Sequence, residues 1–407
     1  MKKSELRNYA ALIARKGGNI QKGQEVVIRA GLDQPEFVQI LVEECYRAGA
    51  GKVMVEWSYD ALAQLHVRYQ KEKTLCKTED WELARLTHRR DTLPVMIHLE
   101  SEDPDGLKGI NQKKYMKAIQ AKSLVAKPYR DAMENKYQWC IAGVPGEAWA
   151  KKMYPHLRKS QAVEQLWRDI LRVSRAEGDA VANWTEHNAD LRARCDHLNA
   201  LKLRKLHYTA ANGTDLTVGL IPGAVFAGGS EKTRSGVEFN PNIPSEEVFT
   251  SPKAGEAEGI VYATRPLSYM GQLIEDFSVR FEGGRAVEVH AGRNEELLKA
   301  AIAMDPNAAM LGECALIPAS SPISQSGLLF YSTLYDENAS CHLALGAGFN
   351  ECYPGYEKYS KAELQEIGIN DSLIHEDFMI GCESMDIDGY TEDGQCVPIF
   401  RHGEWAF

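Results

Sequence analysis

The chain has 407 residues, of which 44% are hydrophobic and 26% are charged, and its formal net charge is −10. This composition is typical of a globular protein, and the length exceeds the usual size of one hydrophobic core, so we expect two domains. The acidic balance argues against a nucleic-acid partner, because phosphate binding needs a concentrated basic face.

In the first half, short apolar runs alternate with amphipathic stretches. The runs EVVIRA (25–30) and KVMVEW (52–57) favour strands, and residues 35–50 between them have apolar side chains at helical spacing. This order predicts a β-α-β unit and therefore a parallel sheet. The pattern recurs with VMIHLE (95–100), a polar helical stretch to about residue 130, and YQWCIAG (137–143).

The second half has a different pattern. Helical periodicity dominates from residue 159 to about residue 199, and strand pairs with turns follow. Asn212-Gly213 and Gly283-Gly284 each lie between two β-type runs, which predicts a hairpin at each place. We therefore expect an open α/β domain over residues 1–200 and an α+β, largely antiparallel domain over residues 201–407.

Several familiar motifs are incomplete. The segment LGAGFNE lacks the third glycine of a dinucleotide-binding turn, and no phosphate-binding G-x-x-x-x-G-K is present. IHEDFMIG begins like the zinc-protease helix H-E-x-x-H, but Met379 stands where the second His is needed. The acidic stretch near the end has Ser384 and Gln395 at the first and twelfth positions of a calcium loop, where Asp and Glu are required.

The cysteines and the amino-terminal residues indicate the cellular location of the protein. Nine cysteines are an odd number without C-x-x-C spacing, which favours reduced thiols over a disulfide framework or a zinc ribbon. The first residues form an amphipathic pattern without the apolar core of a signal peptide, and no apolar run approaches the roughly 18 residues of a membrane helix. We therefore expect a cytoplasmic protein with no membrane partner.

Four segments of the second half share an unusual feature, an acid or His inside or beside a run that otherwise has the pattern of a buried core. They are NIPSEEVFTSP with Glu246 and Glu247, AMLGECALIP with Glu313, LYDENASCHLALG with Glu337 and His342, and SLIHEDFMIGC with His375 and Asp377. Buried carboxylates need partners, and these segments contain no Lys or Arg. A bound cation would supply the positive charge that Lys or Arg would otherwise provide.

Carboxylates and imidazoles together suit divalent ions such as zinc, cobalt or manganese. On a strand, His375 and Asp377 share one face while Glu376 points to the other. The set exceeds one tetrahedral site, and two ions that share a bridging carboxylate would use all of it. Each residue alone also fits a hydrogen-bonded core position, and only the recurrence in four segments favours metal. We expect Glu246 and Asp336 to be ordinary helix-start or surface acids.

The segments PSEEVFTSP, LGECALIP, DENASCHLALG and IHEDFMIG resemble the signature blocks of the M29 metallopeptidases, the thermophilic family of aminopeptidases T, S and II. GTDLTVGL and residues 30–57 are also similar to family segments, so the resemblance covers most of the chain. It implies a two-domain chain that forms a homodimer, with two divalent ions (zinc, cobalt, manganese or magnesium) in a catalytic domain over residues 201–407. The metal ligands that it implies are Glu247, Glu313, His342, His375 and Asp377.

The resemblance also implies that Glu337 is the catalytic carboxylate and counts as a further ligand. Several family members carry a Tyr seven residues after the first ligand His, where this chain has Phe349, although Tyr353 or Tyr356 could approach the site from the same loop. Strand alternation turns Cys341 away from the face of His342.

The function that the resemblance implies is release of amino-terminal residues from peptides with a free N-terminus, with Glu337 as general base. Two alternatives stay open. One is another two-metal hydrolase of amides or esters, phosphoesters included. The other is a catalytically weakened metal-binding protein of the same fold, in which Phe349 marks the loss of activity.

Overall fold

A computed structural model of the chain describes residues 1–101, 103–269 and 272–407. The chain divides into two compact units, the first made of residues 1–185 and 230–244 and the second of residues 186–229 and 245–407. The domain boundary expected near residue 200 stays a prediction. The return of residues 230–244 to the first unit was not part of that expectation.

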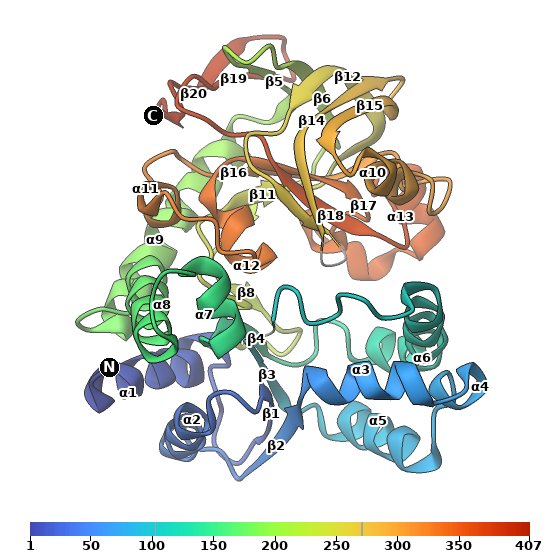
Figure 1. Cartoon of the computed structure of the whole chain (residues 1–407). Helices are drawn as coiled ribbons and strands as arrows, with labels where there is room; N and C mark the ends of the chain where they lie inside the picture. Colours follow the sequence, from blue (N-terminus) through green and yellow to red (C-terminus); the bar gives the residue numbers. More distant parts are fainter. Residues whose placement is uncertain (102, 270–271) are drawn as a thin grey trace. The chain divides into compact units, whose positions relative to one another are not determined.

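The first unit contains the parallel sheet that the sequence predicts (Figure 1). Its strands are β1 (Glu25–Gly31), β2 (Lys52–Ser58), β3 (Val95–Glu100), β4 (Trp139–Gly143) and β10 (Asn242–Ile243). The strand order is β10-β4-β3-β1-β2, and each neighbouring pair is parallel. Strand β10 comes from the returning segment, which also forms the short ribbon of β8 (Glu231–Lys232) and β9 (Glu238–Phe239).

Helices connect these strands. They are α1 (Lys3–Leu12), the π-helix η1 (Ile13–Gly17), α2 (Pro35–Ala48), α3 (Asp60–Tyr69), α4 (Glu72–Leu75), α5 (Asp80–Thr92), α6 (Gln112–Met133), α7 (Glu147–Met153) and α8 (Lys159–Val173). Helix α2 shows why the local prediction works: proline lies in its first turn, the left-handed Gly49 ends it, and the predicted apolar face, including Phe37 and Leu41, is buried.

The helical stretch predicted from 159 to 199 is two helices, α8 and α9 (Ala180–Ala200). The helix is interrupted between them because Arg175 and Gly178 adopt left-handed backbone angles. The side chain of Asn183 donates hydrogen bonds to the carbonyls of Arg175 and Glu177, which lie in the segment that connects the two helices.

The second unit is built on antiparallel sheets. The larger sheet has the order β13-β14-β12-β6-β5-β19-β20-β21 with β15 beside β14, and the smaller has the order β18-β17-β16-β11-β7. The larger sheet consists of β5 (Leu203–Thr209), β6 (Asp215–Leu220), β12 (Pro252–Tyr262), β13 (Leu267–Tyr269), β14 (Gln272–Glu282), β15 (Arg285–Arg293), β19 (Asp386–Thr391), β20 (Cys396–Arg401) and β21 (Glu404–Trp405). The smaller consists of β7 (Ala227–Gly228), β11 (Val248–Thr250), β16 (Leu311–Leu316), β17 (His342–Gly346) and β18 (His375–Met379).

Both predicted hairpins are confirmed, because β5 pairs with β6 across Asn212-Gly213 and β14 with β15 across Gly283-Gly284. The helical turns of this unit are α10 (Glu295–Ile302), α11 (Pro322–Ser326), α12 (Thr333–Asp336), η2 (Glu337–Ala339), η3 (Asn350–Cys352), η4 (Tyr356–Lys358) and α13 (Lys361–Ile367). The helices among the described residues are too short or too polar to cross a membrane. The nine cysteines are free thiols.

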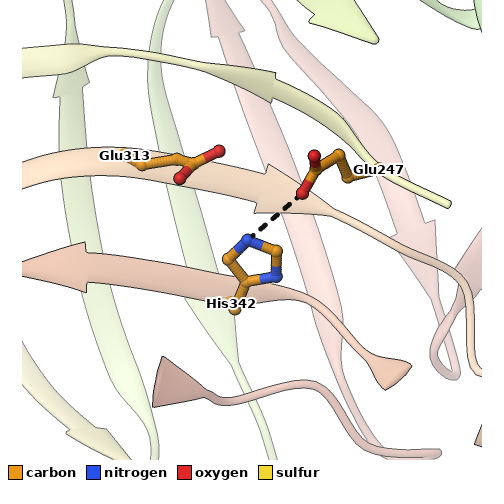
Figure 2. Close-up of side chains that lie close together, drawn as sticks. All are labelled: Glu247, Glu313 and His342. Carbon is orange, nitrogen blue, oxygen red and sulfur yellow. Dashed lines mark ion pairs between the residues drawn. The ribbon is translucent and has the colours of Figure 1, made fainter. Parts of the chain in front are cut away.

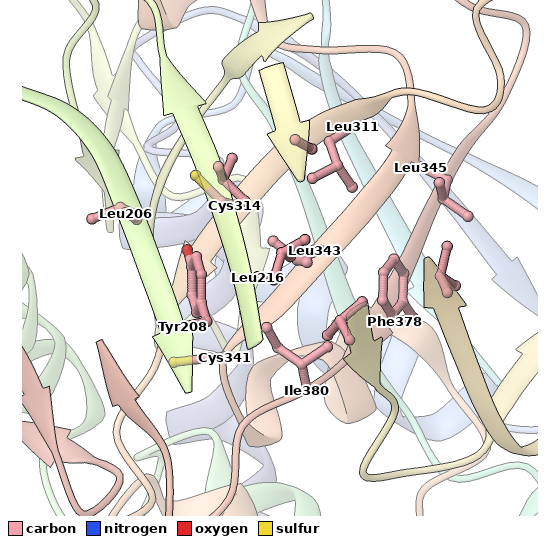
Figure 3. Packing of buried hydrophobic residues seen from close by; sticks show 14 of the residues in the cluster. Leu206, Tyr208, Leu216, Leu311, Cys314, Cys341, Leu343, Leu345, Phe378 and Ile380 are labelled. Carbon is pink, nitrogen blue, oxygen red and sulfur yellow. The ribbon is translucent and has the colours of Figure 1, made fainter. Parts of the chain in front are cut away.

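The core of the second unit lies on one face of the smaller sheet (Figure 3). Cys314, Leu343 and Phe378 are neighbours across β16, β17 and β18, and they pack in one cluster with Tyr208 and Leu216 of the larger sheet. Because side chains alternate along each strand, the residues between these core positions point to the opposite face. That opposite face carries the acids and histidines singled out from the sequence.

Candidate metal centre

Strand register brings the predicted residues together on one face of the smaller sheet. Glu313 of β16 lies opposite Ala344 of β17, which lies opposite Asp377 of β18. His342 and His375 are the first residues of β17 and β18, and Glu247 directly precedes β11. Four segments that are far apart in the sequence thus converge on one place, as the sequence predicts, whereas their role as metal ligands stays a prediction.

The donor atoms lie within ion-pair distance of one another. Nε2 of His342 is 3.5 Å from a carboxylate oxygen of Glu247 (Figure 2) and 3.9 Å from one of Asp377. Nε2 of His375 is 3.2 Å from Glu313 and 3.3 Å from Asp377. The atoms form two compact groups, Glu247-Glu313-His342 and Glu313-His375-Asp377, each with its donor atoms within 4.8 Å. Glu313 belongs to both groups.

Backbone carbonyls orient the two imidazole rings. Nδ1 of His342 donates a hydrogen bond to the carbonyl of Glu337 at 2.9 Å, and Nδ1 of His375 donates to the carbonyl of Ala347 at 2.7 Å. These bonds place the proton on Nδ1 when the ring is neutral and leave the Nε2 lone pair facing the carboxylates. This is the arrangement in which proteins present His to a metal ion.

The electrostatics of this cluster show an excess of buried negative charge. Burial and the neighbouring Glu313 raise the pKa of Glu247 to about 8. Burial, followed by repulsion from Asp377 and Glu247, raises the pKa of Glu337 well above its ordinary value. Burial alone would lower the pKa of His375, but the carboxylates beside it raise it far above the ordinary value.

A divalent cation fits this donor set. Oδ1 of Asp377 is buried and receives no aligned hydrogen bond from the described residues, although it lies near Nε2 of His375. Within the described part of the chain, no Lys or Arg forms an ion pair with these acids, whose pairs are to His342 and His375. Carboxylate oxygens and imidazole nitrogens are ligands of zinc, cobalt and manganese, and a cation would balance the charge that the protein leaves uncompensated.

Glu337 lies in the turn η2 beside this cluster and is partly buried. The fully buried Asn338 holds this turn: its amide donates to the carbonyl of Leu334 at 2.9 Å, and its Oδ1 accepts the backbone N–H of Glu246 at 2.7 Å. Asn338 therefore ties the Glu337 turn to the segment that carries Glu247. The sequence reasoning missed it, and its only signal was an uncharged polar residue inside a buried run.

The expectation that Glu246 and Asp336 are ordinary helix-start or surface acids is wrong as to exposure, because both side chains are buried, although Asp336 does lie in the short helix α12. The carboxylate of Asp336 accepts the backbone N–H groups of Phe330 and Ser332 and so closes the loop before α12. Burial raises the pKa of Asp336 to about 7 although these hydrogen bonds lower it. Local sequence could not show that tertiary packing covers this loop.

Phe349 packs directly against the cluster. Its ring centroid is 5.0 Å from that of His375 and 5.2 Å from that of Phe249, and its backbone N–H donates to Ser251. Phe349 therefore restrains a predicted ligand by packing.

Three residues that are close to His342 or Phe349 in the sequence pack in apolar clusters. Tyr353 and Tyr356 pack against a separate apolar cluster of Ile221, Leu364 and Ile369, so their approach to the site stays a prediction. The thiol of Cys341 donates to the carbonyl of Ile317 and lies in the core, which confirms that it points away from the face of His342.

Comparison with known proteins agrees with this geometry. The sequence profile of the family described as thermophilic metalloprotease (M29) matches residues 2–405. Aminopeptidase AmpS of Bacillus subtilis is 40% identical over 405 residues, covering 99% of this chain and 98% of the relative. Aminopeptidase T of Thermus thermophilus is 38% identical over 406 residues, covering 99% of both chains.

A solved structure of wild-type AmpT from Thermus thermophilus superposes with a TM-score of 0.92 at 37% identity over the full length of both chains. A dihydroxypyridine dioxygenase from Pseudomonas putida, 13% identical with a TM-score of 0.50 over 99% of this chain and 96% of the other, shares the fold alone. The expected α/β fold class is thus confirmed by a related structure. The chain belongs to the M29 family of metallo-aminopeptidases.

Proposed function

We propose that the chain releases amino-terminal residues from peptides with a free N-terminus, using two divalent ions bound by its second unit. The observation that carries this proposal is the membership of Glu313 in two overlapping donor groups. One carboxylate shared between two sets of ligands could bridge two neighbouring ions. The ligands are Glu247, Glu313, His342, His375 and Asp377, with Glu337 at the edge of the set.

Two bound cations would supply Lewis acidity, which lowers the pKa of a water molecule and polarises the peptide carbonyl. Glu337 would accept a proton from the attacking water and donate one to the leaving amine. Recognition of the free α-amino group by a bound ion or by nearby carboxylates would explain action at the end of a peptide.

Zinc, cobalt, manganese and magnesium are the ions that we propose for this site. The two imidazoles favour the first three, since magnesium prefers oxygen ligands. We also propose that residues 201–407 act as the catalytic domain, that the chain forms a homodimer, and that it works in the cytoplasm.

The substitution Glu337→Gln tests the general base. We expect both ions to remain bound while hydrolysis of aminoacyl anilides falls by about 100-fold to 10,000-fold, as for loss of a general base. The matched control is Glu376→Gln on the opposite face of β18, which should retain near-normal turnover. Near-normal turnover by the Glu337 variant would remove this residue from the role.

The substrate class needs its own test. We expect hydrolysis of unblocked peptides, no hydrolysis of N-acetylated peptides, loss of activity with a chelator and recovery with cobalt or zinc. Equal hydrolysis of blocked substrates or of phosphoesters would favour another two-metal hydrolase. Bound metal without any hydrolysis would favour a catalytically weakened protein in which Phe349 replaces a functional Tyr.

A further inference from the structure

A cavity of about 580 Å³ lies within the first unit, against one face of its parallel sheet. Arg29, Glu56 and His98 line it from the carboxyl-terminal halves of β1, β2 and β3. The chain goes from β1 to β2 on one side and then to β3 on the other, so the strand order reverses between β1 and β3. In open α/β sheets, ligands bind outside the carboxyl ends of the strands at such a reversal. The volume is that of a small-molecule site.

The face that borders the cavity is unusually polar. Register places Glu56, Arg29, His98 and Ile141 at one level across β2, β1, β3 and β4. Parallel sheets covered by helices are normally apolar on both faces. The opposite face meets this expectation, since Ile28, Ile97, Cys140 and Ala142 are fully buried there. The polar row at this level departs from that pattern.

The charges around the cavity favour an anion. Arg29 Nε lies 3.3 Å and Arg85 Nη1 3.4 Å from the carboxylate of Glu56, and Arg89 pairs with the same carboxylate. Nε of the buried Arg89 has no hydrogen-bond partner among the described residues. Arg29 and Arg85 line the cavity together with Glu56 and Glu100, and Arg89, which is not among the lining residues, pairs with Glu56 from beside it. Three guanidinium groups thus converge on the single carboxylate of Glu56.

Neutral and aromatic groups complete the lining. Burial, together with Arg29 and Arg89, lowers the pKa of His98 to about 4, so its ring is neutral at pH 7 and can donate one hydrogen bond. That ring forms no hydrogen bond with any residue that the structure describes. Tyr137 and Trp139 line the same cavity and offer flat apolar surfaces.

We propose that this switch-point cavity, lined by Arg29, Glu56, His98, Tyr137 and Trp139, binds a small organic anion whose carboxylate or phosphate is joined to a planar ring. Arg29 and Arg85 pair with the anionic group, because guanidinium geometry matches carboxylate and phosphate. His98 donates a hydrogen bond, and the planar ring packs on Tyr137 and Trp139. The proposal is independent of peptide hydrolysis, because the lining contains no residue of the metal centre.

Calorimetric titration of the full-length, metal-loaded protein at constant ionic strength tests this site. The probes are AMP and indole-3-acetate, which represent the phosphate and carboxylate sources, with inorganic phosphate and indole as the separate parts. We expect saturable binding of at least one ring-bearing anion, tighter than either of its parts alone. Binding of only AMP or only indole-3-acetate shows whether the site takes a phosphate or a carboxylate and supports the proposal.

Two variants locate the binding. Arg29→Gln and His98→Gln should each weaken it at least about tenfold, which corresponds to ~1.4 kcal/mol. The matched control is Arg47→Gln, because Arg47 is also paired with Glu and its side chain is 47% exposed, as is that of Arg29. Thermal unfolding of each variant shows whether it is folded.

Three results would overturn the proposal. They are absence of saturable binding by both ring-bearing anions, equal weakening by Arg47→Gln, and wild-type affinity in Arg29→Gln. The last would be the result for an anion that binds at the metal centre instead.

Discussion

At the scale of single residues, Oδ1 of Asp377 is the atom with the clearest need for a partner, because it is buried and receives no aligned hydrogen bond from the described residues. Asp377→Asn keeps the shape of the side chain but removes its charge. We expect at least about a tenfold loss of metal affinity, or ~1.4 kcal/mol. Metal content after dialysis against a series of buffered metal concentrations measures this, with Glu376→Gln again as control. Unchanged affinity would show that Asp377 is not a ligand.

The lowered pKa of His98 leads to a prediction about how stability depends on pH. Its folded-state pKa is lowered to about 4 from 6.5 by burial and by Arg29 and Arg89, while Glu56 opposes this shift. The unfolded chain therefore binds more protons between these values, and His98 makes the folded state lose stability as the pH falls from about 6.5 to about 4. Urea unfolding at pH 7 and pH 5 should show a smaller decrease in His98→Gln than in the wild type. Any loss of metal at acidic pH affects both proteins, so equal decreases would contradict the prediction.

At the scale of elements, strands β16, β17 and β18 pack into the hydrophobic core with one face and carry the candidate metal centre on the other. Leu343 follows His342 directly and is fully buried in the core, beside Cys314 and Phe378 of the neighbouring strands. Leu343→Ala should lower the free energy of unfolding by about 2–5 kcal/mol, the usual cost of such a cavity. Chemical denaturation measures it. Metal should stay bound under native conditions, and loss of metal without loss of stability would show that the two faces are not separable in this way.

At the scale of the whole molecule, stability should depend on bound cations. Without them, four acids lie close together, and among the described residues only His342 and His375 pair with them; the acids are Glu247, Glu313, Glu337 and Asp377. A cation present at about 1,000-fold above its Kd would add about 4 kcal/mol to stability. Calorimetric unfolding should therefore shift to lower temperature with a chelator and recover with zinc or cobalt. An unchanged transition would contradict tight binding to the folded state.

Much of the local structure was predictable from sequence. Hydrophobic period and end signals, which act over a few residues, predicted strands β1 to β4 and helix α2. The hairpins at Asn212-Gly213 and Gly283-Gly284 follow from turn chemistry, which is equally local. The break between α8 and α9 was missed, because side-chain bonds from Asn183 stabilise it and the periodicity continues through it.

The candidate metal centre was predictable as a set of residues but not as a geometry. Acids and histidines within apolar runs were visible, and alternation fixed which of His375, Glu376 and Asp377 share a face. The sharing of Glu313 depends on the pairing of β16 with β17 and of β17 with β18. The role of Asn338 depends on its contact with the distant Glu246, and the burial of Asp336 depends on the packing that covers its loop; no local pattern records either.

The sequence by itself determined the alternation of elements, the residues of the candidate metal centre and, through its signature segments, the family, since these depend on short-range patterns. Only the tertiary structure decided which carboxylate belongs to both donor groups, which acids are buried, and that residues 230–244 return to complete the parallel sheet. It also revealed the switch-point cavity, because strand order is a property of how distant segments pair. The physical reason is that burial and register arise from long-range packing, which individual segments do not encode.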